Sequence, residues 1–142
     1  MNSDNNAAVI KDKMKAGICR KYGPPEVVKI EERLKPIPKA DEVLIRVHAT
    51  TVASGDCRVR SANIPALYRP MMILMYGVGK PRQPIFGTEL SGQVEAVGNN
   101  VTVYKVGNNV FAMTGMKMGA HAEYITLSEA GMIVPKPNNI SY

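Results

Sequence analysis

The chain has 142 residues, of which 45% are hydrophobic, so its length and composition suit a single globular domain with its own core. Its net charge is +6, but the 18 lysine and arginine residues are scattered from Lys11 to Lys136 without a dense block, which argues against a nucleic-acid partner. No apolar run reaches the roughly 20 residues that span a bilayer, and the polar start lacks a signal-peptide pattern, so we expect a cytoplasmic protein with no membrane partner.

Local patterns predict a succession of short strands after a polar start. Residues 1–13 are polar and aperiodic, so we expect a flexible tail followed by one domain over residues 14–142. Alternating or β-branched runs are typical of strands. Such runs occur at 14–21, 26–33, 42–52, 90–97, 109–113, 120–127 and 132–134.

The pattern changes between residues 53 and 84. A Ser-Gly-Asp triplet is typical of a helix start, and a short helix is expected over 54–61. Residues 62–84 are rich in proline and methionine without a consistent period, so we expect an irregular segment there. Its apolar, adaptable side chains leave two interpretations open, a loop pinned over the domain or a lid that shapes a hydrophobic pocket.

Two copies of the pentapeptide Val-Gly-Asn-Asn-Val occur, at 97–101 and 106–110. Glycine and asparagine tolerate positive φ, so both copies predict tight turns between strands. A phosphate-binding nest is the functional alternative.

Two cysteines, Cys19 and Cys57, are too few for a four-thiolate zinc site. A single disulfide is conceivable, but the expected reducing compartment favours buried free thiols. His48 interrupts the alternation of the strand at 42–52, and we interpret it as structural.

Many short strands, frequent turns and little helix favour a barrel. A parallel sheet would need alternating helices, which this sequence lacks. The predicted fold class is therefore mainly β, a partly open barrel with one or two short helices.

Residues 84–98 carry the most informative motif, which reads G-x-E-x-x-G-x-V-x-x-V-G from Gly87. Three further stretches accompany it, at 20–28, 41–49 and 104–125. The last contains Tyr-Lys-Val-Gly-Asn-Asn-Val-Phe and Gly-Ala-His-Ala-Glu-Tyr. All four, in this order, resemble the chaperonin-10-like (GroES-like) domain of the medium-chain dehydrogenase/reductase superfamily, which implies that barrel.

The resemblance points to the zinc-independent branch, which includes quinone oxidoreductases. Zinc-dependent relatives place a cysteine at the position of Ala53 and a histidine at that of Thr88. Neither residue here offers a ligand atom, so no metal site and no zinc are expected. The zinc-free pattern has asparagine and proline where this chain has Ala53 and Ser54, the positions the family places near the nicotinamide.

The resemblance implies the substrate-side domain of an NAD(P)H-dependent oxidoreductase, either quinone reductase or alcohol dehydrogenase-like. This domain would form one wall of a cleft in which hydride passes to a small hydrophobic carbonyl, quinone or enone. The glycine fingerprint of a nucleotide-binding Rossmann domain is absent from these residues. The chain alone is therefore expected to bind neither NADPH nor NADH and to be inactive.

No residue is assigned as catalytic with certainty, but four are candidates for the cleft. Asp56 is interpreted first as a helix cap and second as catalytic. Glu89 is expected to pair with a basic residue or a backbone N–H. His121 is either a proton donor or a packed histidine. Tyr68 lies in the irregular segment, where its phenol would face a carbonyl.

Two other functions compete with the enzyme domain. A free-standing, non-catalytic GroES-like binding or assembly module is the main alternative, and a basic surface for an anionic polymer is the weaker one. Because the missing Rossmann domain would leave one side of the barrel bare, we also expect weak self-association into a homo-oligomer.

Overall fold

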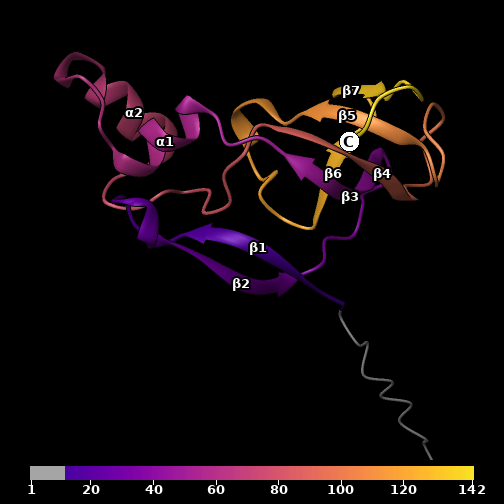
Figure 1. Ribbon diagram of the computed structural model, residues 1–142, viewed down its shortest axis with the longest axis horizontal. Helices are drawn as coiled ribbons and strands as arrows, with labels where there is room; N and C mark the ends of the chain where they lie inside the picture. Colours follow the sequence, from indigo (N-terminus) through magenta and orange to yellow (C-terminus); the bar gives the residue numbers. More distant parts are fainter. Residues whose placement is uncertain (1–11) are drawn as a thin grey trace, which may run out of the picture.

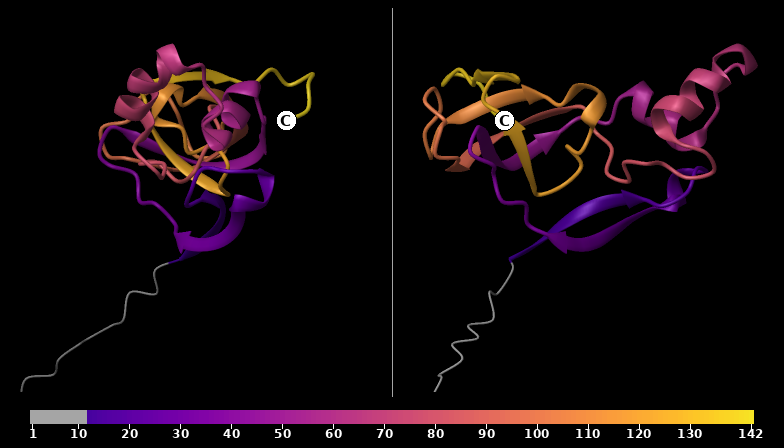
Figure 2. Two further views of the ribbon diagram at one scale, coloured as in Figure 1. Left: turned by 90° about the vertical axis from the view of Figure 1, so that its left-hand side faces the viewer. Right: turned by 180° about the vertical axis from the view of Figure 1, so that it is seen from behind.

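The computed structural model describes residues 12–142, so all but the last two residues of the expected 1–13 tail lie outside the described part. The chain enters through a two-stranded antiparallel hairpin, β1 (Lys13–Cys19) and β2 (Val28–Leu34), with a 3₁₀ turn at Pro25–Val27 between them. The hairpin lies beneath the rest of the molecule in Figures 1 and 2.

A five-stranded antiparallel sheet forms the body of the domain. Its strands are β3 (Glu42–Thr50), β4 (Glu89–Val97), β5 (Asn109–Met113), β6 (Tyr124–Ser128) and β7 (Met132–Pro135), in the order β6-β3-β4-β5-β7. Strand β3, which lies between β6 and β4, is rich in β-branched residues, which favour strands. The sequence placed these five strands to within one or two residues at each end, except that β6 begins four residues later than expected.

Residues 120–123, expected as strand, instead link the sheet to the hairpin. Ala122 bridges Ala16, and Ile85 bridges Ile18. Backbone N–H groups of Gly17 and Cys19 donate to the carbonyls of His121 and Pro84, both at 2.8 Å. These contacts close one side of the sheet, which confirms the prediction of a mainly β, partly open barrel.

Two apolar clusters hold the domain together. The larger one fills the barrel with side chains from all five strands of the sheet, including the fully buried Val43, Ile45 and Val110. The smaller one joins the hairpin to the helices through Cys19, Val59, Phe86 and Met118.

The helices stand apart from the sheet as a lobe, at the left of Figure 1. Helix α1 (Ser54–Ser61) has the predicted bounds. The expectation of an irregular segment over 62–84 is wrong in part, since it contains a 3₁₀ turn (Ala66–Tyr68) and helix α2 (Arg69–Tyr76). Pro70 lies in the first turn of α2, where its missing N–H costs no hydrogen bond. None of the helices in the described residues is long and apolar enough to cross a membrane.

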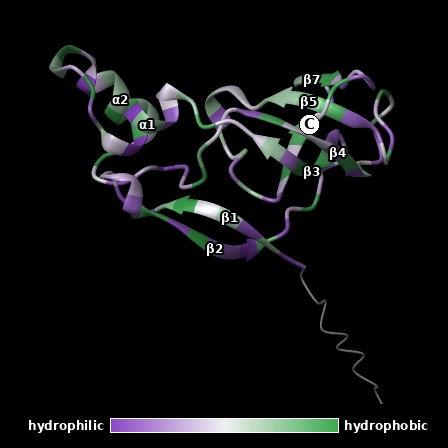
Figure 3. Ribbon diagram, in the orientation of Figure 1, coloured by the Kyte–Doolittle hydropathy of each residue, from purple (hydrophilic) through white to green (hydrophobic). Residues whose placement is uncertain are grey.

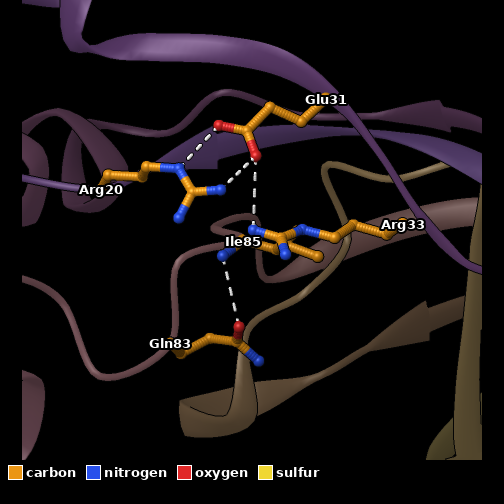
Figure 4. Close-up of polar contacts among 5 residues, drawn as sticks. All are labelled: Arg20, Glu31, Arg33, Gln83 and Ile85. Carbon is orange, nitrogen blue, oxygen red and sulfur yellow. Dashed lines mark hydrogen bonds and ion pairs between the residues drawn. The ribbon is translucent and has the colours of Figure 1, made fainter.

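An ion-paired cluster fastens the outer face of the hairpin, as Figure 4 shows. Arg20 binds Glu31 with two nitrogens, at 2.8 and 2.6 Å, and Arg33 approaches the same carboxylate at 3.4 Å. The Arg20 guanidinium lowers the pKa of the Glu31 carboxyl through this hydrogen bond. The nearby Gln83 side chain accepts a hydrogen bond from the N–H of Ile85, which fixes the segment that bridges β1.

Both cysteines are free, but the expectation that both are buried is half wrong. Cys19 is buried in the smaller cluster, and burial raises the pKa of its thiol. Cys57 is exposed because it follows Asp56 on α1, and the helix turns Asp56 inward and its neighbour outward.

Candidate functional site

Asp56 fixes the start of α1 and ties it to the motif at residues 84–98. Its Oδ2 accepts a hydrogen bond from the N–H of Ala53 at 2.8 Å, and its Oδ1 accepts one from the N–H of Gly87 at 3.1 Å. Since Ala53 has no side-chain acceptor, the carboxylate alone supplies the cap. The carboxylate is buried, with Asp56 only 5% exposed, so the helix-cap interpretation is confirmed, whereas a catalytic role for Asp56 stays a prediction.

Gly87 allows the motif to lie directly beneath the ring of His121. Its φ is +89°, and a Cβ at this position would lie 2.8 Å from Nε2 and 2.9 Å from the backbone N of His121. Both distances are too short for a carbon, so only glycine fits. The N–H of His121 in turn donates to the carbonyl of Phe86 at 2.9 Å.

His121 reaches from this turn to the end of β3. Its Nε2 lies 2.9 Å from the carbonyl oxygen of Thr51. A carbonyl only accepts, so Nε2 carries the proton of this bond. The ring is thus oriented by the backbone, which favours the interpretation of His121 as a packed, positioning residue.

Glu89 completes the arrangement at the start of β4. The hydroxyl of Thr51 donates to Glu89 Oε2 at 2.8 Å, and the hydroxyl of Thr50 donates to the Glu89 backbone carbonyl at 2.7 Å. The side-chain partner of Glu89 is thus a hydroxyl rather than the basic residue or backbone N–H that the sequence suggested. We call Asp56, Gly87, His121, Thr51 and Glu89 the polar chain. Hydrogen bonds join Asp56 to Gly87 and join His121 through Thr51 to Glu89, and Gly87 meets His121 by close packing.

The polar chain unites three of the four candidate residues. Tyr68 is not part of it, since it ends the 3₁₀ turn before α2 and is 52% exposed. Ala53 and Ser54 lie next to it, as the cap and first residue of α1. The sequence did not single out Thr51, which joins His121 to Glu89, although the paired threonines at a strand end were a visible signal.

A second tyrosine braces the helical lobe from the hairpin side. The hydroxyl of Tyr22 donates to the carbonyl of Gly77, just after α2, at 2.9 Å. Burial raises the pKa of this phenol. The contact holds α2 against the smaller apolar cluster, where Tyr76 also packs.

The residues at the family's zinc position do not fit a zinc ion. Ala53 and Thr88 present no nitrogen, sulfur or carboxylate there. Within residues 12–142, no group of three or more His, Cys, Asp and Glu side chains is arranged to hold a metal ion. No chemical step is therefore assigned to a metal at this site.

Comparisons with known proteins agree with the fold and the motif. Residues 39–138 match the family model of the alcohol dehydrogenase GroES-like domain. A quinone oxidoreductase of Sus scrofa is 37% identical over 105 residues, which are 73% of this chain and 28% of that protein. A zinc-type alcohol dehydrogenase-like protein of Staphylococcus aureus is 31% identical over 114 residues, 80% of this chain and 29% of that protein.

Comparison with solved structures also finds quinone oxidoreductases. The quinone oxidoreductase from Coxiella burnetii superimposes with a TM-score of 0.75 at 25% identity, covering 92% of this chain and 39% of that one. The chain thus spans well under half the length of the relatives it matches. It belongs to the alcohol dehydrogenase GroES-like domain family and is a quinone oxidoreductase-like domain of the medium-chain dehydrogenase/reductase superfamily.

Proposed function

We propose that this chain is the substrate-side domain of a zinc-independent, NAD(P)H-dependent oxidoreductase of the quinone reductase type, active in the cytoplasm. The observation that carries the proposal is the polar chain. It joins the G-x-E motif, the end of β3 and the first turn of α1 into one fixed surface. A preformed, rigid wall is what a hydride-transfer cleft requires, because reacting atoms must be held within a narrow range of distance.

In this proposal the cofactor supplies the hydride, and the residues of this chain shape the cleft. Ala53 and Ser54 lie at its edge and offer a small surface rather than a side-chain contact to the cofactor. Asp56 and His121 act as positioning residues, since their polar atoms already bind the backbone. The substrate is a small hydrophobic carbonyl, quinone or enone, because helix α2 of the lobe beside the wall is mostly apolar.

A domain exchange tests the proposal. The segment of the Sus scrofa quinone oxidoreductase that aligns with this chain would be replaced by residues 12–142, and NADPH oxidation measured with ortho- and para-quinones. The expected result is quinone-dependent turnover by the hybrid and no turnover or NADPH binding by the 142-residue chain alone. A folded hybrid that binds NADPH but reduces no quinone would overturn the proposal and favour the non-catalytic module.

Two substitutions in the hybrid separate positioning from chemistry. His121→Phe keeps the ring but removes the bond to Thr51, and we expect a higher KM and a smaller change in kcat. Thr126→Ser, on a partly buried position of β6 outside the polar chain, is the matched control and should leave both constants unchanged. Equal loss of activity in both variants would mean that the polar chain has no special part in the reaction.

A further inference from the structure

Helix α2 is apolar around almost its whole circumference, yet only one side of it is buried. Of its eight residues, only Arg69 is charged. Met72 faces inward and is 6% exposed, and Tyr76 packs on the smaller apolar cluster. Met71 and Leu74, three residues apart, share the outward side, and Leu74 is 72% exposed. Helices that are apolar all round are normally buried, so this outward side is suited to contact with another apolar surface.

The turns on either side of α2 enlarge this apolar surface. Leu67 lies in the 3₁₀ turn before the helix and Val78 just after it, and both are largely exposed. Tyr68 is half exposed, and its amphipathic ring suits a boundary between apolar and aqueous surroundings. We call the exposed part of residues 67–82 the lobe tip. Figures 1 and 2 show the lobe at one end of the long axis of the molecule, so the sheet does not stand between the tip and a flat surface.

Positive charge is concentrated in the same lobe. Residues 57–88 contain five basic residues and no acidic one, so this segment carries five of the six net positive charges of the chain. Four of the basic residues are exposed: Arg58, Arg69, Lys80 and Arg82. None of these four forms an ion pair in the described part of the chain. Figure 3 shows hydrophobic and hydrophilic segments side by side in this lobe.

The basic groups lie directly beside the apolar surface. Arg82 donates from its Nη1 to the carbonyl of Leu74 at 2.8 Å, and from its backbone N–H to the carbonyl of Tyr76 at the same distance. Its charge is thus held at the C-terminal end of α2, where the helix dipole favours a cation. Lys80 follows Val78 in the turn that leaves the helix. The lobe tip therefore has an apolar centre and a basic rim.

We propose that the lobe tip binds peripherally to the surface of a membrane that contains anionic phospholipids. Leu67, Met71 and Leu74 enter the boundary between headgroups and acyl chains, and the basic rim contacts the lipid phosphates. Charge selects this occupant, because a second copy of the chain presents the same positive tip and is repelled, whereas an anionic bilayer attracts it. The projecting shape of the lobe also suits an extended flat surface.

This mode of binding needs no membrane-spanning helix, since an amphipathic surface element only has to lie in the interface. The proposal therefore replaces the expectation of no membrane partner, which rested on the lack of a long apolar run, and a cytoplasmic protein can bind in this way. It uses neither the polar chain nor a cofactor, so it stands or falls separately from the proposed enzyme function.

Sedimentation with vesicles measures the binding and its electrostatic part. The vesicles contain phosphatidylcholine with or without phosphatidylserine, and we expect binding to the anionic ones that weakens as salt is added. One basic residue near an anionic surface is worth about fivefold in affinity, so Lys80→Gln should weaken binding about 3- to 5-fold. Lys105→Gln, at an exposed residue between β4 and β5, has the same net charge and should change affinity less than about twofold.

The apolar part is tested by Leu74→Gln, which should weaken binding about 5- to 20-fold because the leucine no longer enters the lipid. Val103→Gln, at an exposed valine outside the lobe, is the matched control and should bind as the wild type does. Since all four substitutions are at exposed positions, each variant should fold, and circular dichroism checks this.

The methionines report which face meets the lipid. In the chain labelled with ¹³C at its methionine methyl groups, anionic bicelles containing a nitroxide-labelled lipid should broaden the signal of Met71. Met113 and Met132 lie on the sheet and are about as exposed as Met71, so their signals should stay sharp. The three residues together distinguish contact through the lobe tip from contact through exposed methionines in general.

Two results would overturn the role of the lobe tip itself. One is the absence of binding to phosphatidylserine vesicles by the folded wild-type chain. The other is an equal loss in Lys80→Gln and Lys105→Gln, or broadening of Met113 and Met132 in place of Met71, because net charge or another face would then explain the binding.

Three further results would assign the lobe tip to a different occupant. A Met71 signal that changes on dilution but not with labelled lipid would indicate a second copy of the chain. Binding of soluble polyglutamate in preference to vesicles, unaffected by Leu74→Gln, would indicate an acidic protein segment. A hybrid oxidoreductase that reduces quinones but does not bind anionic vesicles would show that the rest of the enzyme covers the tip, and the proposed enzyme function would remain.

Discussion

Gly87 and Gly107 share nearly the same backbone conformation in different surroundings. Their φ angles are +89° and +93°, both in the region that favours glycine. A Cβ at Gly87 would collide with the ring and backbone of His121, whereas a Cβ at Gly107 would meet nothing within 4 Å. Comparing the two glycines therefore separates the energetic cost of backbone strain from the cost of disturbing the close contact with His121.

We expect Gly107→Ala to lower the free energy of unfolding by about 1–2 kcal/mol, from strain alone. Gly87→Ala should cost about 1–3 kcal/mol more, because His121 must move. Urea denaturation of both variants measures the difference. Equal losses would show that the His121 ring shifts without cost and that Gly87 is not required by this contact.

Replacing Asp56 by asparagine should destabilise the chain by about 1–3 kcal/mol. Each carboxylate oxygen accepts from a backbone N–H, and an amide presents a donor to one of them. Asp41→Asn, on an exposed residue before β3, is the control and should change stability by less than about 0.5 kcal/mol. Thermal unfolding followed by circular dichroism compares the two, and similar midpoints would contradict the capping role.

Among the helices and strands, the sequence predicted best those elements that carry one clear local signal. The bounds of α1 followed from its Ser-Gly-Asp start, and β3 followed from its β-branched run. Helix α2 was missed because eight residues are too few to reveal a period, and Pro70 suggested a break. Only the register shows that His48 is an extra residue in a bulge of β3, between Val47 and Ala49.

The candidate site was predictable residue by residue but not as a connected unit. Asp56, Glu89 and His121 could be chosen from the motif and from their titratable side chains. Their connection runs through backbone groups of Gly87 and Thr51 and through the Thr51 hydroxyl, and the paired threonines were the only signal for it in the sequence.

An ion pair joins the hairpin linker to the sheet and should make stability depend on pH. Lys35 binds Glu95 and lies 4.1 Å from the centre of the Tyr124 ring. This hydrogen bond lowers the pKa of Glu95 from its ordinary 4.5 and raises that of Lys35 from its ordinary 10.5. The stabilisation is therefore fully present between these two values, and it is lost as the pH falls through the lowered pKa or rises through the raised one.

We expect Glu95→Gln to cost about 0.5–1 kcal/mol at pH 7, since the pair is partly exposed. The difference from wild type should shrink as the pH falls through the lowered pKa of Glu95, because the wild-type carboxyl then becomes protonated as well. Glu32→Gln breaks the Lys13–Glu32 pair, which is more than 60% exposed on both sides, and serves as the control with a smaller effect. A difference that stays constant while the pH is lowered until the Glu95 carboxyl is protonated would refute the electrostatic origin.

For the whole molecule, the exposed face of the helical lobe is the surface most suited to weak self-association. Four apolar residues of the lobe are more than half exposed: Leu67 in the 3₁₀ turn, Met71 and Leu74 on α2, and Val78 just after the helix. Such apolar patches tend to find partners, but the net charge of +6 opposes contact between copies. Salt screens this repulsion, so association should tighten as ionic strength rises.

Sedimentation equilibrium at 20 and 500 mM salt measures this association. We expect Leu74→Gln to weaken it, and Val103→Gln, at an exposed valine outside the lobe, to leave it unchanged. A strict monomer in both buffers at high concentration would show that the barrel is self-sufficient, which favours the free-standing module.

The strand order also determines when each strand can pair with its neighbours during synthesis on the ribosome. Strand β3 lies between β4 and β6, and its register with β6 pairs Leu44 with Thr126, about 80 residues later in the chain. A ribosome adds roughly 5–20 residues each second, so β3 emerges several seconds before its last neighbour exists. During that interval one edge of β3, which contains the fully buried Val43 and Ile45, has no partner. Nascent chains are therefore most open to chaperones, and to misassembly with one another, before residues 124–128 are made.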